Sequence, residues 1–439
     1  ESVCGKEIKF LCKMEKDGDL RKDVHMMEFN HTVNRLLMHH TQSRKKKLRL
    51  RTYAVVCLNE ECGLLEWVNN TECLRQAIHD SHYYYYNPLL LALQNGGRDN
   101  TAHQDCQQLG QLFNRSSYLL HENLSKDEYP NKDIEKSNFF NFTNLFPHVT
   151  YREVYQSFIE YQQKFEDDIT QMTTAYQTLI YEIFRYQPAL HRWFLERFTD
   201  PTVWMENRNI YVNSVAVWSA VGYIIGLGDR HTENVLLDVT NGECVHVDFD
   251  CLFDKGLTLA KPEIVPFRLT SNMIDAMGVI GIEGAFRHTL EISLQVLRDN
   301  KETLLNILEP FLRDPTVAWS RSGRAQRSAD QNQPSAHGKD SSSGQNSKTV
   351  LETENKEAKE MLLKISDRLS GVYNIIHPHR DKFIRGALKR GETLPTKGIG
   401  PAKEELLPLS VSGQAQKLIE EATAEENLAQ LYIGWQPWI

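Results

Sequence analysis

The alternation of apolar and polar residues near the start of the chain predicts a small α+β unit. Residues 6–13 (KEIKFLCK) and 49–57 (RLRTYAVVC) have the pattern of strands, and a helical pattern over residues 23–39 lies between them. A third short apolar strand is expected at residues 64–68 (LLEWV). It ends at an Asn-Asn pair where the composition changes, so we expect a hinge there.

Beyond this unit the pattern is mainly helical. Helical periodicity covers residues 151–227, stops at a hairpin-like segment, and returns over residues 281–312. Residues 80–150 are rich in Asn, Gln, Tyr and His with weak periodicity, which predicts a partly disordered insertion. The remaining segments are a polar linker over residues 320–347, a helix near 350–370 and a last helix near 413–432.

The hairpin-like segment contains Asn241-Gly242 between two apolar runs, a pair that suits a two-residue type I′ turn. Such a turn would place Asn234 opposite Phe249. Asn234 and Asp248 would then lie together at the open end of the hairpin.

The polar residues at this open end match the needs of phosphoryl transfer. Asp229 lies five residues before Asn234, the spacing of a kinase catalytic loop, and Asp248-Phe249 stands where a metal-binding D-F-G motif would. Asn234 and Asp248 offer oxygen ligands that suit Mg²⁺, and Asp229 offers a carboxylate to an attacking hydroxyl. Each residue alone would be interpreted as an ordinary polar loop position, but the combined spacing favours an ATP site.

Composition narrows the class of protein. The 439 residues, of which 41% are hydrophobic and 25% charged, predict a soluble globular protein with two or three structural units. The net charge of −8 argues against a protein whose whole surface binds nucleic acid. The 8 cysteines form no C-x-x-C pair, which predicts reduced thiols in a cytosolic or nuclear protein. The apolar run at residues 215–227 is too short to cross a bilayer and predicts a core helix, and the absence of an initial methionine suggests a fragment.

The sequence also contains the motifs FLCK, LRKD, EWVNNT, GLGDRHTEN, ECVHVDFDCLFDKG and PEIVPFRLT, and a tail with Gly-Trp. Together they resemble the phosphatidylinositol 3-kinase-related protein kinases, and within that family the ATR type of DNA-damage checkpoint kinase. The resemblance covers residues 6–76, 185–318 and 405–439. LRKD with CLFDKG favours the checkpoint branch.

The resemblance implies a bilobal α+β kinase fold with a small β-rich N-lobe and a larger, mainly helical C-lobe. Residues 1–68 would form the N-lobe, truncated at its start so that the phosphate-binding loop is missing. The C-lobe would follow at 69–318, with the insertion at about 80–150. Residues 319–404 would be a partly disordered regulatory linker, and 405–439 a helical FATC tail packed on the kinase lobe.

By the same resemblance, Lys13 is the lysine that grips the ATP phosphates and Asp23 is its acidic partner. The segment after the strand is longer than the family pattern, so Lys16 is a competing assignment. Strand alternation favours Lys13.

Trp67 is similar to the residue on which adenine stacks, and the backbone of Glu66 and Val68 should meet the adenine edge. A simple core role for the aromatic ring is the alternative. Asp229 is similar to the catalytic aspartate, and His231 to the histidine beside the transferring phosphate. A buried structural histidine is the other interpretation of His231.

The resemblance implies a serine/threonine kinase that uses ATP and Mg²⁺, with Mn²⁺ as an alternative metal. Its substrates would carry Ser or Thr followed by Gln, and it would act in DNA-damage and replication-stress signalling in the nucleus. Its expected partners are an obligate protein of the ATRIP type, activator proteins and, through them, DNA. A homodimer of heterodimers is expected for the full-length protein, without membrane association.

Two other functions compete, a lipid kinase of the same fold and a pseudokinase scaffold. Acidic and basic residues balance between Phe249 and Arg268, so no basic cluster is available for a phosphoinositide headgroup. The presence of Asp229, Asn234 and Asp248 argues against a pseudokinase.

Overall fold

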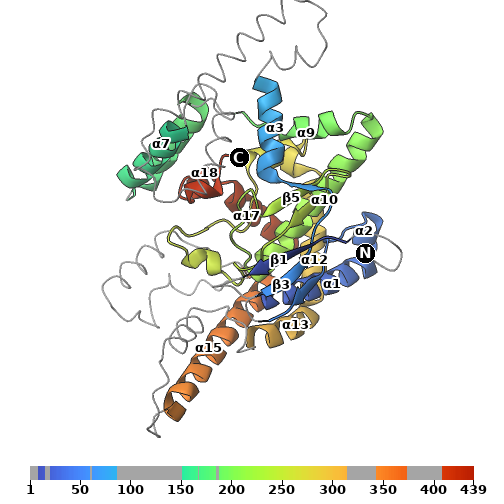
Figure 1. The fold of residues 1–439 in the computed structure, drawn as a ribbon, viewed down its shortest axis with the longest axis vertical. Helices are drawn as coiled ribbons and strands as arrows, with labels where there is room; N and C mark the ends of the chain where they lie inside the picture. Colours follow the sequence, from blue (N-terminus) through green and yellow to red (C-terminus); the bar gives the residue numbers. More distant parts are fainter. Residues whose placement is uncertain are drawn as a thin grey trace, which may run out of the picture.

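The small lobe is built on a three-stranded antiparallel sheet. The computed structural model describes residues 8–14, 20–59, 62–86, 151–166, 168–183, 187–313, 343–372 and 408–439. Within these ranges the first sheet has the order β1 (Phe10–Met14), β3 (Cys62–Glu66) and β2 (Val55–Cys57). Helices α1 (Arg21–His39) and α2 (Thr41–Lys45) accompany it (Figure 1). The expected strand–helix–strand order is confirmed.

The second expected strand is shorter than the pattern over residues 49–57 indicated. Only Val55–Cys57 pairs with β3. The side-chain amide of Asn34 donates to the Leu50 carbonyl at 2.8 Å, and its oxygen accepts from the Leu50 N–H at 2.7 Å. Both backbone groups of Leu50 are therefore occupied by a helix side chain, and a sheet ladder cannot use them.

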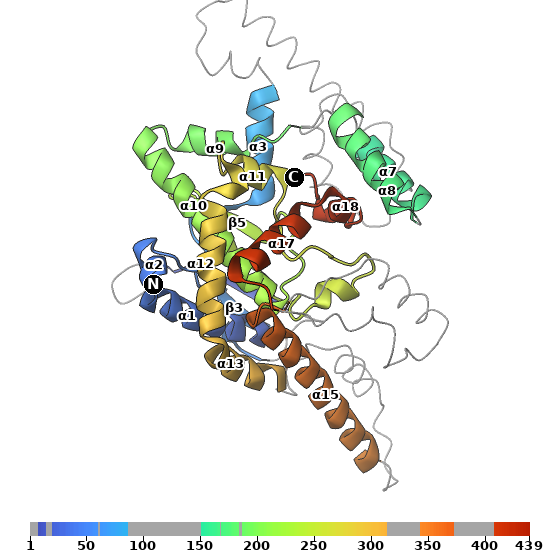
Figure 2. The same ribbon diagram turned by 180° about the vertical axis from the view of Figure 1, so that it is seen from behind.

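The large lobe is organised around the buried helix α10 (Pro201–Ile225). Asp200 caps its start by accepting from the N–H groups of Thr202 and Val203, and Gly226 ends it with a φ of 63°. Every residue from Ser214 to Ile225 is buried, which confirms the expected core helix. Helix α10 packs on α12 (Ala285–Asp299), with α9 (Leu190–Arg197), α11 (Ser271–Asp275) and α13 (Lys301–Arg313) around them (Figure 2).

None of the helices in the described ranges combines the length and the apolar character that a membrane crossing requires.

The hairpin belongs to a second antiparallel sheet with the order β4 (Thr71–Cys73), β5 (Val235–Asp238) and β6 (Cys244–His246). Its predicted register is wrong by two residues, because Asn234 pairs with Val247 rather than with Phe249. The side-chain period of a strand is two, so this even shift leaves every side chain on its predicted face. Asn234 and Asp248 therefore still lie at the same end.

The register differs because the turn has four residues instead of two. The Asp238 carboxylate accepts from the Thr240 N–H at 2.8 Å, and the Asn241 side chain accepts from the Glu243 N–H at 2.8 Å. Only Gly242 within the turn has a positive φ, 75°, whereas a type I′ turn needs two such residues. Side-chain caps thus replace the expected tight turn.

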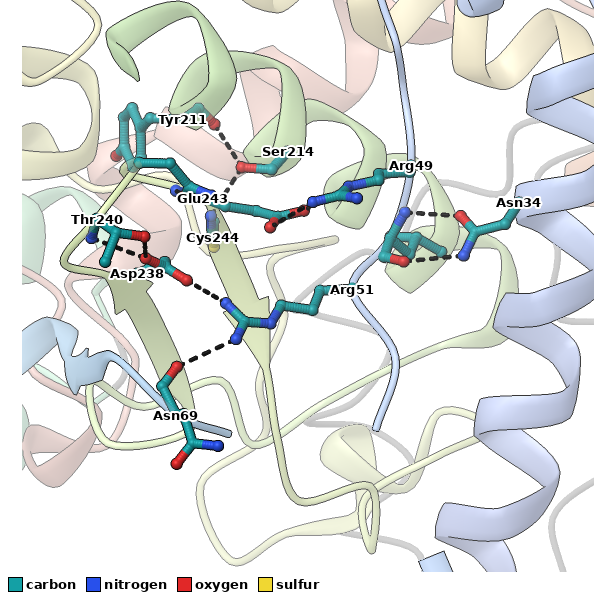
Figure 3. A network of polar contacts seen from close by, with 12 residues as sticks. Asn34, Arg49, Arg51, Asn69, Tyr211, Ser214, Asp238, Thr240, Glu243 and Cys244 are labelled. Atoms are coloured by element: carbon teal, nitrogen blue, oxygen red, sulfur yellow. Dashed lines mark hydrogen bonds and ion pairs between the residues drawn. The ribbon is translucent and has the colours of Figure 1, made fainter. Parts of the chain in front are cut away.

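This turn is also where the small lobe is anchored on the large lobe. Arg49 donates to both carboxylate oxygens of Glu243 at 3.2 Å, and Arg51 donates to Asp238 and to the Asn69 carbonyl (Figure 3). Both carboxylates are buried. The arginines are more exposed, but moving either one away would leave a buried carboxylate without its charge partner, so these contacts fix the two lobes together at the turn between β5 and β6.

The C-terminal tail docks on the large lobe, as predicted. Helix α17 (Val411–Thr423) lies against α12, followed by α18 (Glu425–Leu428) and a 3₁₀ turn, Ile433–Trp435. Arg268, in the segment after Asp248, donates to the carbonyls of Trp435, Gln436 and Ile439 at 2.7–2.8 Å. The expected last helix near 413–432 ends at Thr423, because Ala424 adopts an extended backbone.

The other described helices are α3 (Leu74–Tyr86), α7 (Tyr151–Lys164), α8 (Ile169–Gln177) and α15 (Ser343–Leu369), with a π-helical turn at Thr178–Ile183. Helix α15 confirms the helix expected near 350–370. Lys16, most of the 80–150 insertion and most of the 319–404 linker lie outside the described residues.

Trp438 provides a test of tail docking. Its side chain is 2% exposed and stacks on Phe158 of α7 with ring centroids 4.3 Å apart. We expect Trp438→Ala to lower the free energy of unfolding by about 3–5 kcal/mol, the usual cost of removing a buried aromatic group. Tyr432→Ala, at a side chain 55% exposed, should change it by less than about 0.5 kcal/mol. Urea unfolding followed by circular dichroism would measure both, and equal effects would contradict the docked tail.

Candidate active site

The loop between α10 and β5 holds Asp229 in an unusual backbone conformation. Its φ is 58°, in the left-handed region, and its N–H donates to the Glu263 carboxylate. Its carbonyl accepts from the side-chain amide of Asn234 at 2.9 Å. Both backbone groups of Asp229 are therefore bonded to side chains, and its half-exposed carboxylate is left directed toward solvent.

Arg230 braces this loop against the strand that leads to Asp248. The buried guanidinium donates to the carbonyls of Gly228 at 2.9 Å and Val247 at 2.8 Å, and also to that of Asp248. Burial lowers the pKa of Arg230, and Asp248 and Asp229 oppose that effect. The arginine fixes the spacing of the two aspartates through the backbone on either side of it. Sequence reasoning did not assign it a role, although an arginine directly after the candidate catalytic aspartate was visible.

Asn234 and Asp248 form the candidate metal site. The Asn234 amide nitrogen is used on the Asp229 carbonyl, so the amide oxygen is the atom available to a cation. Asp248 also has a positive φ, 61°, and its carboxylate is 40% exposed. These are hard oxygen donors of the kind that Mg²⁺ prefers, and they fit a metal that shares its other ligands with phosphate and water. Among the described residues, no group of three or more His, Cys, Asp or Glu side chains could hold a metal ion. A metal at Asn234 and Asp248 would therefore need further ligands from phosphate or water.

Lys13 lies at this site. Its ammonium nitrogen is 3.5 Å from the second Asp248 carboxylate oxygen, and its strand position faces Gly63. Asp23 is buried in the first turn of α1. Burial, Asp23 and Asp248 together raise the pKa of the Tyr53 hydroxyl, so both carboxylates lie within electrostatic reach of that group. The structure thus brings Lys13 beside Asp248, whereas the pairing of Lys13 with Asp23 stays a prediction.

The segment after β3 presents the candidate adenine contacts. The N–H groups of Glu66 and Trp67 donate to the Ala54 and Lys9 carbonyls, both at 2.8 Å. The Val68 N–H makes no hydrogen bond within the described part of the chain, so it is the donor available to an adenine edge. The Trp67 ring is 53% exposed, which argues against the alternative of a core aromatic.

His231 lies beside Asp229, with its Nε2 atom 4.0 Å from a carboxylate oxygen. The Glu233 N–H donates to Nδ1 at 3.2 Å, so the neutral ring carries its proton on Nε2. Burial lowers the pKa of His231, against the opposing effect of Asp229. The ring is therefore a neutral donor directed toward Asp229, and it is partly exposed rather than enclosed.

Glu263 is a second residue that sequence reasoning did not assign to the site. Gly228 and Gly256 leave room for its carboxylate, since a Cβ on Gly228 would lie 3.0 Å from the Glu263 oxygen. Burial raises its pKa to about 7 even though it accepts from the Asp229 N–H. An acidic residue within the apolar run PEIVPF was the available signal.

The sequence of the chain is similar to known kinase families and to individual kinases. The model of the phosphatidylinositol 3- and 4-kinase family matches residues 7–321, and that of the FATC domain matches residues 408–439. The chain is 37% identical over 435 residues to the serine/threonine-protein kinase ATR of Arabidopsis thaliana. It is 34% identical over 429 residues to the protein kinase rad3 of Schizosaccharomyces pombe. These alignments cover 99% and 97% of the chain, but the chain spans only 12% and 13% of those relatives.

Among solved structures, the FAT and kinase domain of CtTel1 has a similar fold. Its TM-score is 0.61 at 24% sequence identity, covering 100% of this chain and 22% of that one. This similarity supports the bilobal arrangement described above and concerns the fold alone.

The raised pKa of Glu263 predicts a pH-dependent stability. Between the ordinary value of 4.5 and about 7, the folded state holds a proton that the unfolded state has lost, so this residue lowers stability as pH rises through that window. Glu263→Gln removes the effect. We therefore expect the melting temperature of Glu263→Gln, relative to wild type, to increase from pH 5 to pH 8.

Glu283→Gln is the matched control. Glu283 is exposed, and its hydrogen bond to Arg287 lowers its pKa, so its contribution changes only below its ordinary value. Its melting temperature relative to wild type should stay constant from pH 5 to pH 8. A constant difference for Glu263→Gln as well would contradict the buried, partly protonated carboxyl group.

Proposed function

Since the chain belongs to the phosphatidylinositol 3- and 4-kinase family, we propose that it is a serine/threonine protein kinase that transfers phosphate from ATP with the help of Mg²⁺. The observation that carries the proposal is the gathering of four side chains at one place between the lobes. Asp229, Asn234 and Asp248 approach it from the large lobe, and Lys13 from the small lobe. Phosphoryl transfer needs little more than positioning and charge stabilisation, which these groups can supply.

Each residue has a distinct role in this proposal. Asn234 and Asp248 hold the metal, which supplies charge neutralisation on the phosphates when it is bound; Mn²⁺ is an alternative ion. Lys13 binds the phosphates as a point charge, with Asp23 as the acidic group behind it. Asp229 orients the attacking hydroxyl and takes its proton, and the Nε2–H of His231 donates toward the charge that develops beside it.

The adenine would be held by the segment after β3. Trp67 offers an exposed ring face for stacking, and the backbone of Glu66 and Val68 would meet the adenine edge. These contacts orient the nucleotide without taking part in the transfer.

The charges after Asp248 support a protein hydroxyl over a lipid headgroup as the acceptor. Lys255 donates to Asp250, Lys261 to Gln162, and Arg268 to the C-terminal tail. Each basic side chain of this segment is engaged inside the molecule, so none is freely offered to an inositol phosphate. A pseudokinase is disfavoured because the side chains of Asp229, Asn234 and Asp248 are all present at the site.

The resemblance of the motifs to the checkpoint branch of the family motivates a more specific proposal. We propose phosphorylation of Ser or Thr followed by Gln in nuclear DNA-damage and replication-stress checkpoint signalling. The proposed assembly includes an obligate partner of the ATRIP type, activator proteins that connect it to DNA, and a homodimer of heterodimers. We also propose that residues 319–404 form a regulatory linker and that the N-lobe ends at residue 68.

Phosphate transfer from labelled ATP to paired peptides tests the acceptor. We expect a peptide with Ser-Gln to be phosphorylated at least about tenfold faster than its Ser-Ala counterpart, which corresponds to about 1.4 kcal/mol of barrier. Phosphoinositide vesicles should not be labelled above background. Asp248→Ala, which removes a metal ligand at a solvent-reachable position, serves as the inactive control. Preferential labelling of the lipid would establish the lipid kinase instead.

The choice between Lys13 and Lys16 can be decided by one pair of variants. Lys13 lies beside Asp248, so we expect Lys13→Met to lose nearly all phosphate transfer. Lys16→Met should retain a rate within about twofold of wild type, less than 0.5 kcal/mol of barrier. The rates of both purified variants with the Ser-Gln peptide decide the matter, and the reverse pattern would assign the phosphates to Lys16.

A further inference from the structure

Asp250, two residues after the candidate metal ligand, lies between two lysines. The ammonium of Lys22 donates to one carboxylate oxygen at 2.6 Å. Lys255 donates to the other oxygen and, at 3.1 Å, to the Asp250 carbonyl. Lys22 belongs to the first turn of α1 in the small lobe, whereas Asp250 and Lys255 belong to the large-lobe segment that follows β6. One carboxylate therefore connects the two lobes at the front of the site.

The burial of Lys22 makes this contact more than a surface ion pair. Its side chain is 2% exposed, and a buried ammonium requires a compensating charge. Each of the two Asp250 carboxylate oxygens accepts from one lysine ammonium, Lys22 on one side and Lys255 on the other, so the position of Lys22 is coupled to this carboxylate.

Asp250 is in turn coupled to Asp248. The Asp250 N–H points to the first Asp248 carboxylate oxygen at 3.4 Å, while Lys13 approaches the second at 3.5 Å. Between the two aspartates, the Phe249 side chain is fully buried, and its ring centroid lies 6.0 Å from that of Trp218. The backbone between Asp248 and Asp250 therefore cannot rotate freely. The left-handed backbone of Asp248 adds a further constraint, since this conformation persists only where its surroundings hold it.

We propose that Asp250 is a positioning residue, which ties the first turn of α1 to the Asp248 carboxylate and holds that carboxylate in the orientation that binds metal. The proposal rests on the proposed kinase function. Helix α1 packs on α12 and α13 of the large lobe, so a shift of this helix would act through Lys22 on Asp250 and then on Asp248. Groups behind a metal ligand commonly change metal affinity by about 10–100-fold when they are replaced.

Nucleotide binding measures this role without relying on catalysis. The dissociation constant of a non-hydrolysable ATP analogue would be measured in Mg²⁺ and in EDTA for wild type, Asp250→Asn, Lys22→Met and the double variant. We expect Asp250→Asn to lose about tenfold or more of the affinity gained from Mg²⁺, with binding in EDTA unchanged. Lys22→Met should also lose part of the affinity gained from Mg²⁺. The double variant should lose no more of this affinity than Asp250→Asn does, because both substitutions break the same Lys22–Asp250 contact.

Asp254→Asn is the matched control, because it removes a carboxylate from the same segment. Asp254 pairs with Arg368 of α15 at 2.7 Å, and its own N–H donates to Gly226, away from Asp248. The gain from Mg²⁺ should be preserved in this variant. An equal loss in Asp254→Asn would mean general loosening of the segment and would overturn the proposal. Should Asp250→Asn fail to fold, Lys22→Met and the charge-preserving Asp250→Glu give the same comparison.

The two proposals fail in different ways. A wild-type protein that transfers phosphate, combined with an Asp250→Asn variant that gains full affinity from Mg²⁺, would overturn the positioning role alone. A wild-type protein that transfers no phosphate, but loses Mg²⁺-dependent nucleotide binding on Asp250→Asn, would overturn the kinase function and leave the positioning role in place. Hydrogen exchange over residues 247–258 in nucleotide-free protein should be faster in Asp250→Asn, and equal exchange would also contradict the proposal.

Discussion

The buried guanidinium of Arg230 is the constraint on which the site depends. It donates to carbonyls on both sides of the hairpin entrance, from Gly228 before Asp229 to Asp248 at the far end. Two aspartates in left-handed backbone conformations would otherwise be costly to keep in one arrangement, since each such residue stores on the order of 1–3 kcal/mol. Because one rigid planar group satisfies these carbonyls together, displacing either aspartate would leave a buried donor unmatched.

The C-terminal tail extends this constraint. Arg268 donates to the Arg230 carbonyl at 3.2 Å and to three carbonyls of the tail, while its guanidinium lies 4.2 Å from the Trp435 ring. Thr232, in the loop that carries Asp229, donates to the Gln436 side chain at 2.9 Å. The loop that carries Asp229 is thus supported by residues more than 200 positions away in sequence. A tail that only covered apolar surface would not need these polar contacts to the loop.

Sequence predicted the features that depend on local spacing and failed on those that depend on distant partners. The D-x-x-x-x-N spacing grouped Asp229 and Asn234 in one candidate site, and the structure adds that the Asn234 amide donates to the Asp229 carbonyl within the same loop. The hairpin register was mispredicted because Asp238 and Asn241 use their side chains to build a longer turn, a choice that the Asn-Gly pair does not reveal. The partner of the Asp229 N–H, Glu263, is 34 residues away and is reached only through the packing of two glycines.

Four ion pairs join the described parts of the two lobes with one polarity, with the cation on the small lobe and the carboxylate on the large lobe. At the turn between β5 and β6, Arg49 and Arg51 pair with the buried carboxylates of Glu243 and Asp238. At the candidate active site, Lys13 and Lys22 pair with the more exposed Asp248 and Asp250, and of these four side chains only Lys22 is buried.

A buried carboxylate that loses its cation is left uncompensated, whereas an exposed carboxylate can exchange its partner for water or a cation at little cost. The two pairs at the β5–β6 turn are therefore the costlier ones to separate, and the Lys13–Asp248 pair is the easier one to exchange. In the function proposed above, a metal–nucleotide complex would replace that contact, because it offers Asp248 a cation and Lys13 an anion at the same time. The proposed phosphate-binding role of Lys13 and the proposed metal-binding role of Asp248 are therefore compatible with a separation of 3.5 Å, because one ligand satisfies both charges.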